Sequence, residues 1–158
     1  MRKVLFAVDC SPPSKSAAEY LATVAPHLPG CEVTLFSVMT GIPYDSRELA
    51  KLSSSFPLEV HGSEDHQQEV QQIQNFFQEI TSLLVDNGFP TAKLQTSARP
   101  LRRGVAQDII DEALERDCDT IVVGRRGLSL VQEMLQGSVS HDLMHKAPLA
   151  LWVIGERP

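Results

Sequence analysis

Short apolar runs alternate with segments of helical periodicity along the 158 residues of this chain. The segments between the runs carry apolar residues three and four positions apart, as one buried face of a helix does. Strands that alternate with helices are typical of a parallel sheet joined by right-handed crossovers. We therefore predict an α/β fold, a doubly wound five-stranded parallel sheet with helices on both faces. The strands are expected at Val4–Val8, Val33–Val38, Lys93–Ala98, Thr120–Val123 and Leu149–Ile154, and the helices at Ala17–Leu28, Val70–Leu84, Val105–Leu114 and Ser138–Lys146.

Local signals mark the ends of the predicted helices. Ser11 precedes Pro12 and Pro13, a pattern typical of a helix N-cap followed by prolines in the first turn. Asn87 and Gly88 predict a C-terminal cap on the second long helix, because glycine adopts the left-handed conformation that such caps need. The polar alternation of Lys93–Ala98 is typical of an edge strand.

The stretch Met39–His66 has no sustained period. A segment of this length without a pattern is uncommon in a compact domain unless it is a lid or a mobile insertion. We therefore expect one domain over residues 1–158, with a long variable loop at 39–66 that acts as a lid or a docking loop.

The C-terminal third of the chain contains glycines and hydroxyls spaced to hold a phosphate chain. Gly124 ends an apolar run, Gly127 follows it, and Gly137 with Ser138 closes the segment before a helix. Glycine lets backbone N–H groups approach an anion closely, and a helix N-terminus adds further donors. No lysine follows Gly137, so the segment is not a P-loop. The alternative is that these glycines shape a turn and cap a helix without any ligand.

The spacing G-x2-G-x9-G-[ST] resembles the nucleotide-binding motif of the universal stress protein family. The resemblance covers essentially the whole chain, from VLFAVD near the N-terminus to the last strand, and it implies the strand order 3-2-1-4-5. It also implies that Asp9, after the first strand, and Val38, at the end of the second, help to hold the adenosine part of ATP. The residues that it implies for ribose and phosphates are Gly124, Gly127, Gly137, Ser138, Val139 and Ser140.

Two features found separately meet in one crevice if the strand order is 3-2-1-4-5. Ligands of doubly wound sheets bind beyond the carboxyl ends of the strands where the winding reverses, which is here between the first and fourth strands. Asp9 follows the first strand and Gly124 ends the fourth. A carboxylate can accept from adenine or ribose donors, and main-chain groups beside Val38 can contact the base edge. The alternative for Asp9 is a turn residue that caps the first helix.

The loop after the third predicted strand is longer and more basic than the Gly-x-Pro turn that is frequent in the family. Its arginines, Arg99, Arg102 and Arg103, could supply a cation to the phosphates, and so could Arg125 and Arg126 in the glycine segment. We favour solvated loop charges for all of them. Arg125 is nevertheless retained among the candidate binding residues.

Histidines and cysteines offer no strong metal or redox site. His141 and His145 have the i, i+4 spacing of zinc-binding helices, but Asp142 replaces the catalytic glutamate and no third ligand is apparent nearby. We favour surface histidines and expect no metal ligand. The cysteines form no CxxC pattern and are expected to be reduced thiols; they are Cys10, Cys31 and Cys118.

The net charge of -6 argues against electrostatic contacts with nucleic acid or an anionic membrane. No apolar run approaches the ~18 to 20 residues of a membrane span. The start of the chain, Met1-Arg2-Lys3, leads into a strand rather than a signal peptide. We therefore expect a cytoplasmic protein without nucleic-acid or membrane partners.

Phosphoryl transfer needs charge neutralisation and a group that positions the nucleophile. The sequence offers a phosphate cradle but no evident base beyond Asp9. The resemblance implies an adenine-nucleotide-binding regulatory stress-response protein that takes ATP or AMP, with Mg2+ accompanying the nucleotide, no catalytic residue and at most slow hydrolysis. The alternative is a nucleotide-free dimeric adaptor of the same fold that acts on an unidentified protein partner. In either case the apolar strand at 149–154 predicts a homodimer formed by edge pairing.

Overall fold

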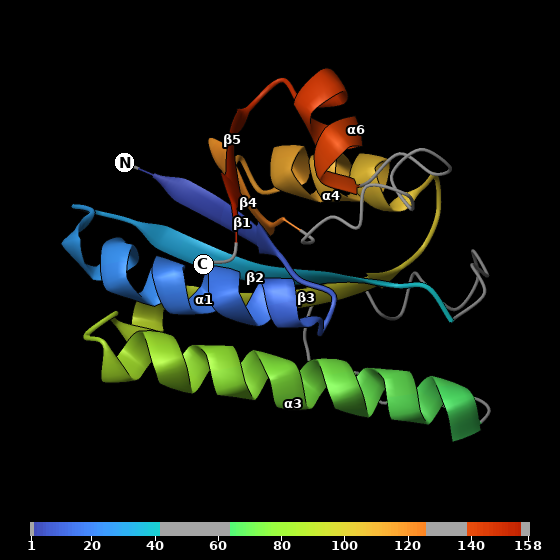
Figure 1. Ribbon diagram of the computed structural model, residues 1–158, viewed down its shortest axis with the longest axis horizontal. Coiled ribbons are helices and arrows are strands. Elements are labelled where there is room, and N and C mark those ends of the chain that lie inside the picture. The colour runs from blue at the N-terminus through green and yellow to red at the C-terminus, as the bar shows by residue number, and fades with distance from the viewer. Residues whose placement is uncertain (1, 42–63, 126–138, 156–158) are drawn as a thin grey trace.

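The computed structural model describes residues 2–41, 64–125 and 139–155, which form the elements in Figure 1. Its sheet has five parallel strands in the order β3-β2-β1-β4-β5, so the predicted fold class and strand order are confirmed. Because the order reverses beside β1, the crevice of a doubly wound sheet lies between β1 and β4. The strands are β1 (Lys3–Ala7), β2 (Glu32–Met39), β3 (Leu94–Pro100), β4 (Thr120–Gly124) and β5 (Ala150–Ile154).

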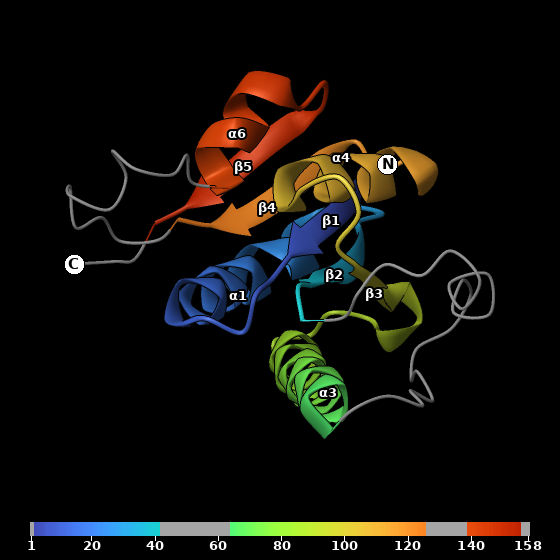
Figure 2. The ribbon, with the colours of Figure 1, turned by 90° about the vertical axis from the view of Figure 1, so that its right-hand side faces the viewer.

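Helices cover both faces of the sheet. Figure 2 shows α1 and α3 on one side of the strands and α4 and α6 on the other. None of the described helices combines the length and the apolar character that a membrane span requires. The helices are α1 (Pro12–Val24), α3 (Glu64–Asp86), α4 (Val105–Glu115) and α6 (Val139–Lys146), with 3-10 turns η1 (Ala25–His27) and η2 (Thr91–Lys93).

The two faces of the central strand build two separate cores, because successive side chains of a strand point to opposite faces. Phe6 packs on the side of α1 and α3, in a cluster that contains Leu21 and Phe77. Leu5 packs on the other side, with Ile109 of α4 and Leu143 of α6. Burial on both faces explains why the central strands are nearly continuous apolar runs.

Both predicted caps are present. Ser11 is the N-cap of α1, its side chain accepts from the Ser14 N–H, and prolines occupy the first helical positions. Gly88 has φ +93°, and the N–H of Phe89 donates to the Leu84 carbonyl at 3.0 Å, closing the end of α3. These signals therefore placed the start of α1 and the end of α3 correctly, whereas α1 ends at Val24 and the rest of the predicted helix is the 3-10 turn η1.

The patternless stretch predicted at 39–66 is shorter in the structure. Strand β2 continues through Met39, which is paired with Pro100 in β3. Helix α3 begins at Glu64, before the first apolar residue of its periodic face at Val70. The remaining part, 42–63, lies outside the described residues.

Strand β5 forms one edge of the sheet, as predicted from the strand order. Ala150 is exposed and the other residues of β5 are half-buried. Trp152 and Ile154 pack beside the α1 core, whereas Leu151 and Val153 pack beside the α4 core. The strand is therefore apolar toward both layers, although its outer edge has no neighbour among the described strands.

Candidate functional site

Asp9 organises the turn between β1 and α1. The side chain is exposed at the carboxyl edge of the sheet. Its Oδ1 accepts from the Ser11 N–H at 3.2 Å and from the Ser14 hydroxyl at 2.8 Å, and also from the Ser11 hydroxyl. Asp9 is thus a turn residue that braces the cap of α1, the alternative that the sequence left open. The same bonds fix its carboxylate beside the crevice.

Cys10 follows Asp9 in a left-handed conformation, with φ 59°. Its thiol donates to the Gln72 carbonyl of α3 at 3.9 Å. Burial, together with the negative charges of Asp9 and Glu69, raises the pKa of this thiol to about 11. Because the thiolate is the reactive form, this pKa favours a turn residue over a redox centre.

Gly124 lies where the first turn of α1 crosses the end of β4. A β-carbon on this residue would stand 2.5 Å from the Pro13 carbonyl oxygen and 3.0 Å from the Ser14 nitrogen. Only glycine leaves room for the helix backbone at that distance. Packing between α1 and β4 therefore requires Gly124, independently of any ligand.

The same helical turn joins the two halves of the crevice. Ser14 donates its hydroxyl to Asp9, and its backbone nitrogen lies against Gly124. Residues after β1 and at the end of β4 are thereby brought together. The structure thus places Asp9 and Gly124 where the sheet order leads us to expect them.

The other candidate residues lie around this edge. The Arg125 side chain is exposed and its N–H donates to the Ile154 carbonyl at 2.7 Å, which extends the pairing of β4 and β5. Val139 and Ser140 begin α6, and Val38 is half-buried near the end of β2. Three candidates, Gly127, Gly137 and Ser138, lie outside the described residues.

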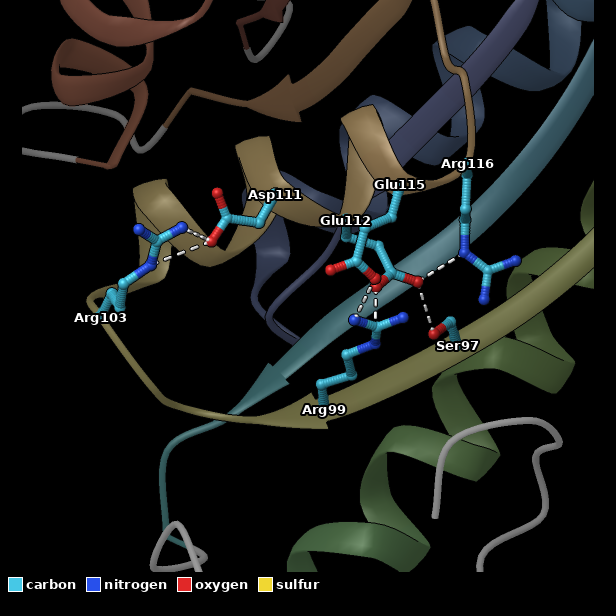
Figure 3. Close-up of polar contacts among 7 residues, drawn as sticks. All are labelled: Ser97, Arg99, Arg103, Asp111, Glu112, Glu115 and Arg116. Carbon is cyan, nitrogen blue, oxygen red and sulfur yellow. Dashed lines mark hydrogen bonds and ion pairs between the residues drawn. The ribbon is translucent and has the colours of Figure 1, made fainter. Parts of the chain in front are cut away.

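The arginines of the third loop hold β3 against α4. Figure 3 shows Arg99 of β3 reaching Glu112 and Glu115 on α4. The Arg99 Nε approaches Glu112 Oε2 at 2.7 Å outside hydrogen-bond geometry, and its Nη1 donates to Glu115 at 2.6 Å. Arg103, in the loop that precedes α4, donates to Asp111 on that helix. Our interpretation of Arg99 as a solvated charge is therefore wrong.

Glu112 is the buried centre of this network. Only 1% of its surface is exposed, and it accepts from the Ser97 hydroxyl at 2.8 Å and from Arg116 one helical turn away. A buried carboxylate needs such partners because water cannot solvate it. No sequence signal points to this network, because Glu112 is a single charged position on an amphipathic helix.

The histidine pair of α6 lies on one helical face, with ring centroids 4.5 Å apart. In the described residues, no group of three or more histidine, cysteine or carboxylate side chains could hold a metal ion. Asp142 lies between the two imidazoles in sequence, 3.9 Å from the Lys146 ammonium. The pair therefore lacks the third protein ligand of a zinc enzyme within this part of the chain.

A hollow of about 370 Å³ lies at the opposite, amino edge of the sheet. It is lined by residues near the starts of the strands, among them Lys3, Glu32 and Gln95, and it contains charges of both signs. Ligands of doubly wound sheets bind at the carboxyl edge instead. We therefore favour the crevice beside Asp9 over this hollow.

Sequence comparison gives one family. A sequence model of the Universal stress protein family matches residues 1–155 of the chain. No curated protein matches the sequence.

Solved structures of universal stress proteins match over nearly the whole chain. One from Archaeoglobus fulgidus in complex with dAMP is 18% identical, with a TM-score of 0.63 and coverage of 98% of each chain. One from Arabidopsis thaliana with AMP bound is 17% identical, with a TM-score of 0.66, covering 99% of this chain and 93% of that one. A third, in complex with cAMP, is 16% identical, with a TM-score of 0.65 and coverage of 99% and 98%. At these identities the likeness shows the fold.

Proposed function

The chain belongs to the universal stress protein family, and from this membership and the geometry of the crevice we propose that it is a regulatory protein that binds an adenine nucleotide. The observation that carries the proposal is the contact of one helical turn with both Asp9 and Gly124 at the switch point of the sheet. Ligand sites of doubly wound folds occur at this position. The similar proteins described above that contain a nucleotide hold AMP, dAMP or cAMP.

Each end of the nucleotide has candidate contacts. The fixed carboxylate of Asp9 accepts from ribose hydroxyls, and the main chain beside Val38 contacts the base. Backbone N–H groups at the start of α6, around Val139 and Ser140, donate to the phosphates, with Arg125 as a nearby cation. The glycine and hydroxyl motif of Gly127, Gly137 and Ser138 supplies the remaining phosphate contacts in this proposal. Mg2+, when bound with ATP, neutralises phosphate charge.

Regulation rather than catalysis follows from the chemistry of Asp9. Its Oδ1 accepts three hydrogen bonds from Ser11 and Ser14, so this oxygen is engaged in the turn and is not placed to take a proton from a nucleophile. Efficient phosphoryl transfer also needs a group that positions the nucleophile. We therefore propose at most slow hydrolysis.

The nucleotide proposal is tested by calorimetric titration of AMP, and of ATP with and without Mg2+. Mass spectrometry of small molecules released by denaturing the purified protein identifies any resident nucleotide. Gly127→Val should abolish binding, because a branched side chain blocks close approach of the backbone to phosphate. If the wild-type protein releases no nucleotide and binds neither AMP nor ATP, the proposal is wrong.

The exposed edge of β5 favours a second candidate, a dimeric adaptor that acts without nucleotide. Leu151–Ile154 are apolar and only half-buried, and the free edge contains no charge or proline that would oppose pairing. Antiparallel pairing with the same strand of a second copy satisfies both edges around a two-fold axis. We propose this dimer for the nucleotide-binding protein too, so the calorimetric titration decides between the two functions.

A further inference from the structure

Glu69 of α3 holds the main chain that leaves β2. Its Oε1 accepts from the Thr40 N–H at 2.8 Å and from the Gly41 N–H at 3.2 Å, and its Oε2 accepts from the same Gly41 N–H at 3.0 Å. A β-carbon on Gly41 would lie 2.8 Å from Oε2. The half-buried carboxylate is therefore fitted closely against this backbone.

This contact lies at the same edge of the sheet as Asp9. Strands β1 and β2 are parallel, so the residues that follow each of them meet at the carboxyl edge. Cys10 connects the two carboxylates, because it follows Asp9 and its thiol donates to Gln72, on the turn of α3 after Glu69. The charges of Asp9 and Glu69 both raise the pKa of this thiol. Glu69 therefore flanks the end of the crevice to which Val38 also belongs.

The hydrogen bonds of Glu69 leave it one acceptor position. A carboxylate has about four lone-pair sites, and the described contacts use two on Oε1 and one on Oε2. The remaining site on Oε2 can accept one further N–H. The exocyclic amine of adenine is such a donor. Thr40, whose N–H donates to Glu69, lies only two residues after Val38, the proposed contact of the base.

We propose that Glu69 is a specificity-determining residue that accepts a hydrogen bond from the exocyclic amine of the adenine base. This inference rests on the proposed function, since it assigns a contact within the same nucleotide site. A base without the amine loses this hydrogen bond and leaves the acceptor site on the Glu69 carboxylate without a donor. Two fixed carboxylates at the adenosine end, Asp9 and Glu69, also repel the phosphates toward α6 and Arg125.

A comparison of two ligands with two proteins tests the contact. The ligands are AMP and purine riboside 5′-monophosphate, which differ only in the exocyclic amine, and the proteins are wild type and Glu69→Ala. Calorimetry of the wild-type protein should give about tenfold tighter binding of AMP, the effect of one charge-assisted hydrogen bond. In Glu69→Ala the ratio of the two affinities should fall to about one. The change in this ratio between the two proteins measures the coupling between Glu69 and the amine.

A merely structural anchor predicts a different result. Loss of the contacts to Thr40 and Gly41 would weaken both ligands equally and leave the ratio unchanged. Glu79→Ala is the matched control, because Glu79 lies on the same helix, carries the same charge and pairs with Lys15 in solvent. If Glu69→Ala does not fold, Glu69→Gln keeps an acceptor for the backbone and should still lower the ratio.

The outcomes separate this inference from the proposed function. A wild-type protein that binds AMP with an unchanged ratio in the Glu69 variants overturns the role of Glu69 alone. A wild-type protein that binds AMP and purine riboside 5′-monophosphate equally well also overturns the role of Glu69 alone. A wild-type protein that binds no adenine nucleotide overturns both proposals.

Discussion

The carbonyl oxygen of Pro13 lies 2.5 Å from the position that a β-carbon would occupy on Gly124. The first turn of α1 therefore rests directly on the backbone at the end of β4. The same turn holds Asp9 through the Ser14 hydroxyl. One close helix-strand contact thus sets both the packing of the sheet and the shape of the crevice.

We expect Gly124→Ala to destabilise the protein by about 1–3 kcal/mol, because the new methyl group must displace main chain rather than a flexible side chain. Urea unfolding measures the change in the free energy of unfolding. Gly155→Ala is the control, since a β-carbon there meets nothing within 4 Å, and its effect should stay within about 0.5 kcal/mol. Equal stability of the two variants would contradict the contact with Pro13.

Asp9→Asn should separate the two roles of this side chain. Asparagine keeps an Oδ1 acceptor for Ser11 and Ser14, so stability should change by less than about 1 kcal/mol. Nucleotide affinity should fall about tenfold, because the charged acceptor for ribose is lost. Ser11→Ala removes the N-cap and should cost about 1 kcal/mol, with a smaller loss of affinity because the Asp9 charge is kept and the Ser14 hydroxyl still holds it. An Asn variant that binds AMP as wild type does would show that Asp9 only caps the turn.

Glu112→Gln should destabilise the protein by about 2–4 kcal/mol, because Arg99 and Arg116 lose the charge between them. The figure is at the lower end for a buried ion pair, since both arginine side chains are about 30% exposed. Glu115→Gln is the control: that side chain is half exposed and also pairs with Arg99, so the loss should be below about 1 kcal/mol. Similar thermal unfolding of the two variants would rule out a central role for Glu112.

Cys10 should react slowly with iodoacetamide although its side chain is exposed. A pKa of about 11, two units above the ordinary value of 9.0, leaves roughly one hundredth of the usual thiolate fraction at pH 8. The alkylation rate should rise with pH and reach half of its maximum near pH 11. Peptide mass spectrometry distinguishes Cys10 from the buried Cys31 and Cys118. A rate at pH 8 equal to that of a free thiol would contradict the raised pKa.

Periodicity and capping signals predicted the strands and the helices, because these depend on residues close together in sequence. The edge position of β5 was predicted from the strand order. The resemblance supplied the strand order, and with it the meeting of Asp9 and Gly124. The role of Gly124 against Pro13 could not be predicted, since it depends on where a distant helix crosses the strand. Glu69 and Glu112 were missed for the same reason. Each is one polar position on an amphipathic helix, and only the tertiary structure identifies its partners.

The free edge of β5 gives a sharp test of the dimer. The Ala150 N–H donates to Asp119, and the Ile154 carbonyl accepts from Arg125, so these two residues direct their backbone groups toward β4. Because the direction alternates along a strand, the N–H of Val153 points to the free edge.

Val153→Pro therefore removes a donor from the edge without removing a bond between β4 and β5. If two copies pair through β5, this variant should be monomeric at micromolar concentration in sedimentation equilibrium, whereas wild type is dimeric. Val153→Ala is the matched control, because it loses the same packing against the α4 core but keeps the N–H, and it should remain dimeric. A proline variant that still dimerises would place the subunit contact elsewhere, because edge pairing depends on backbone hydrogen bonds that proline cannot donate. A monomeric wild-type protein would contradict the dimer itself.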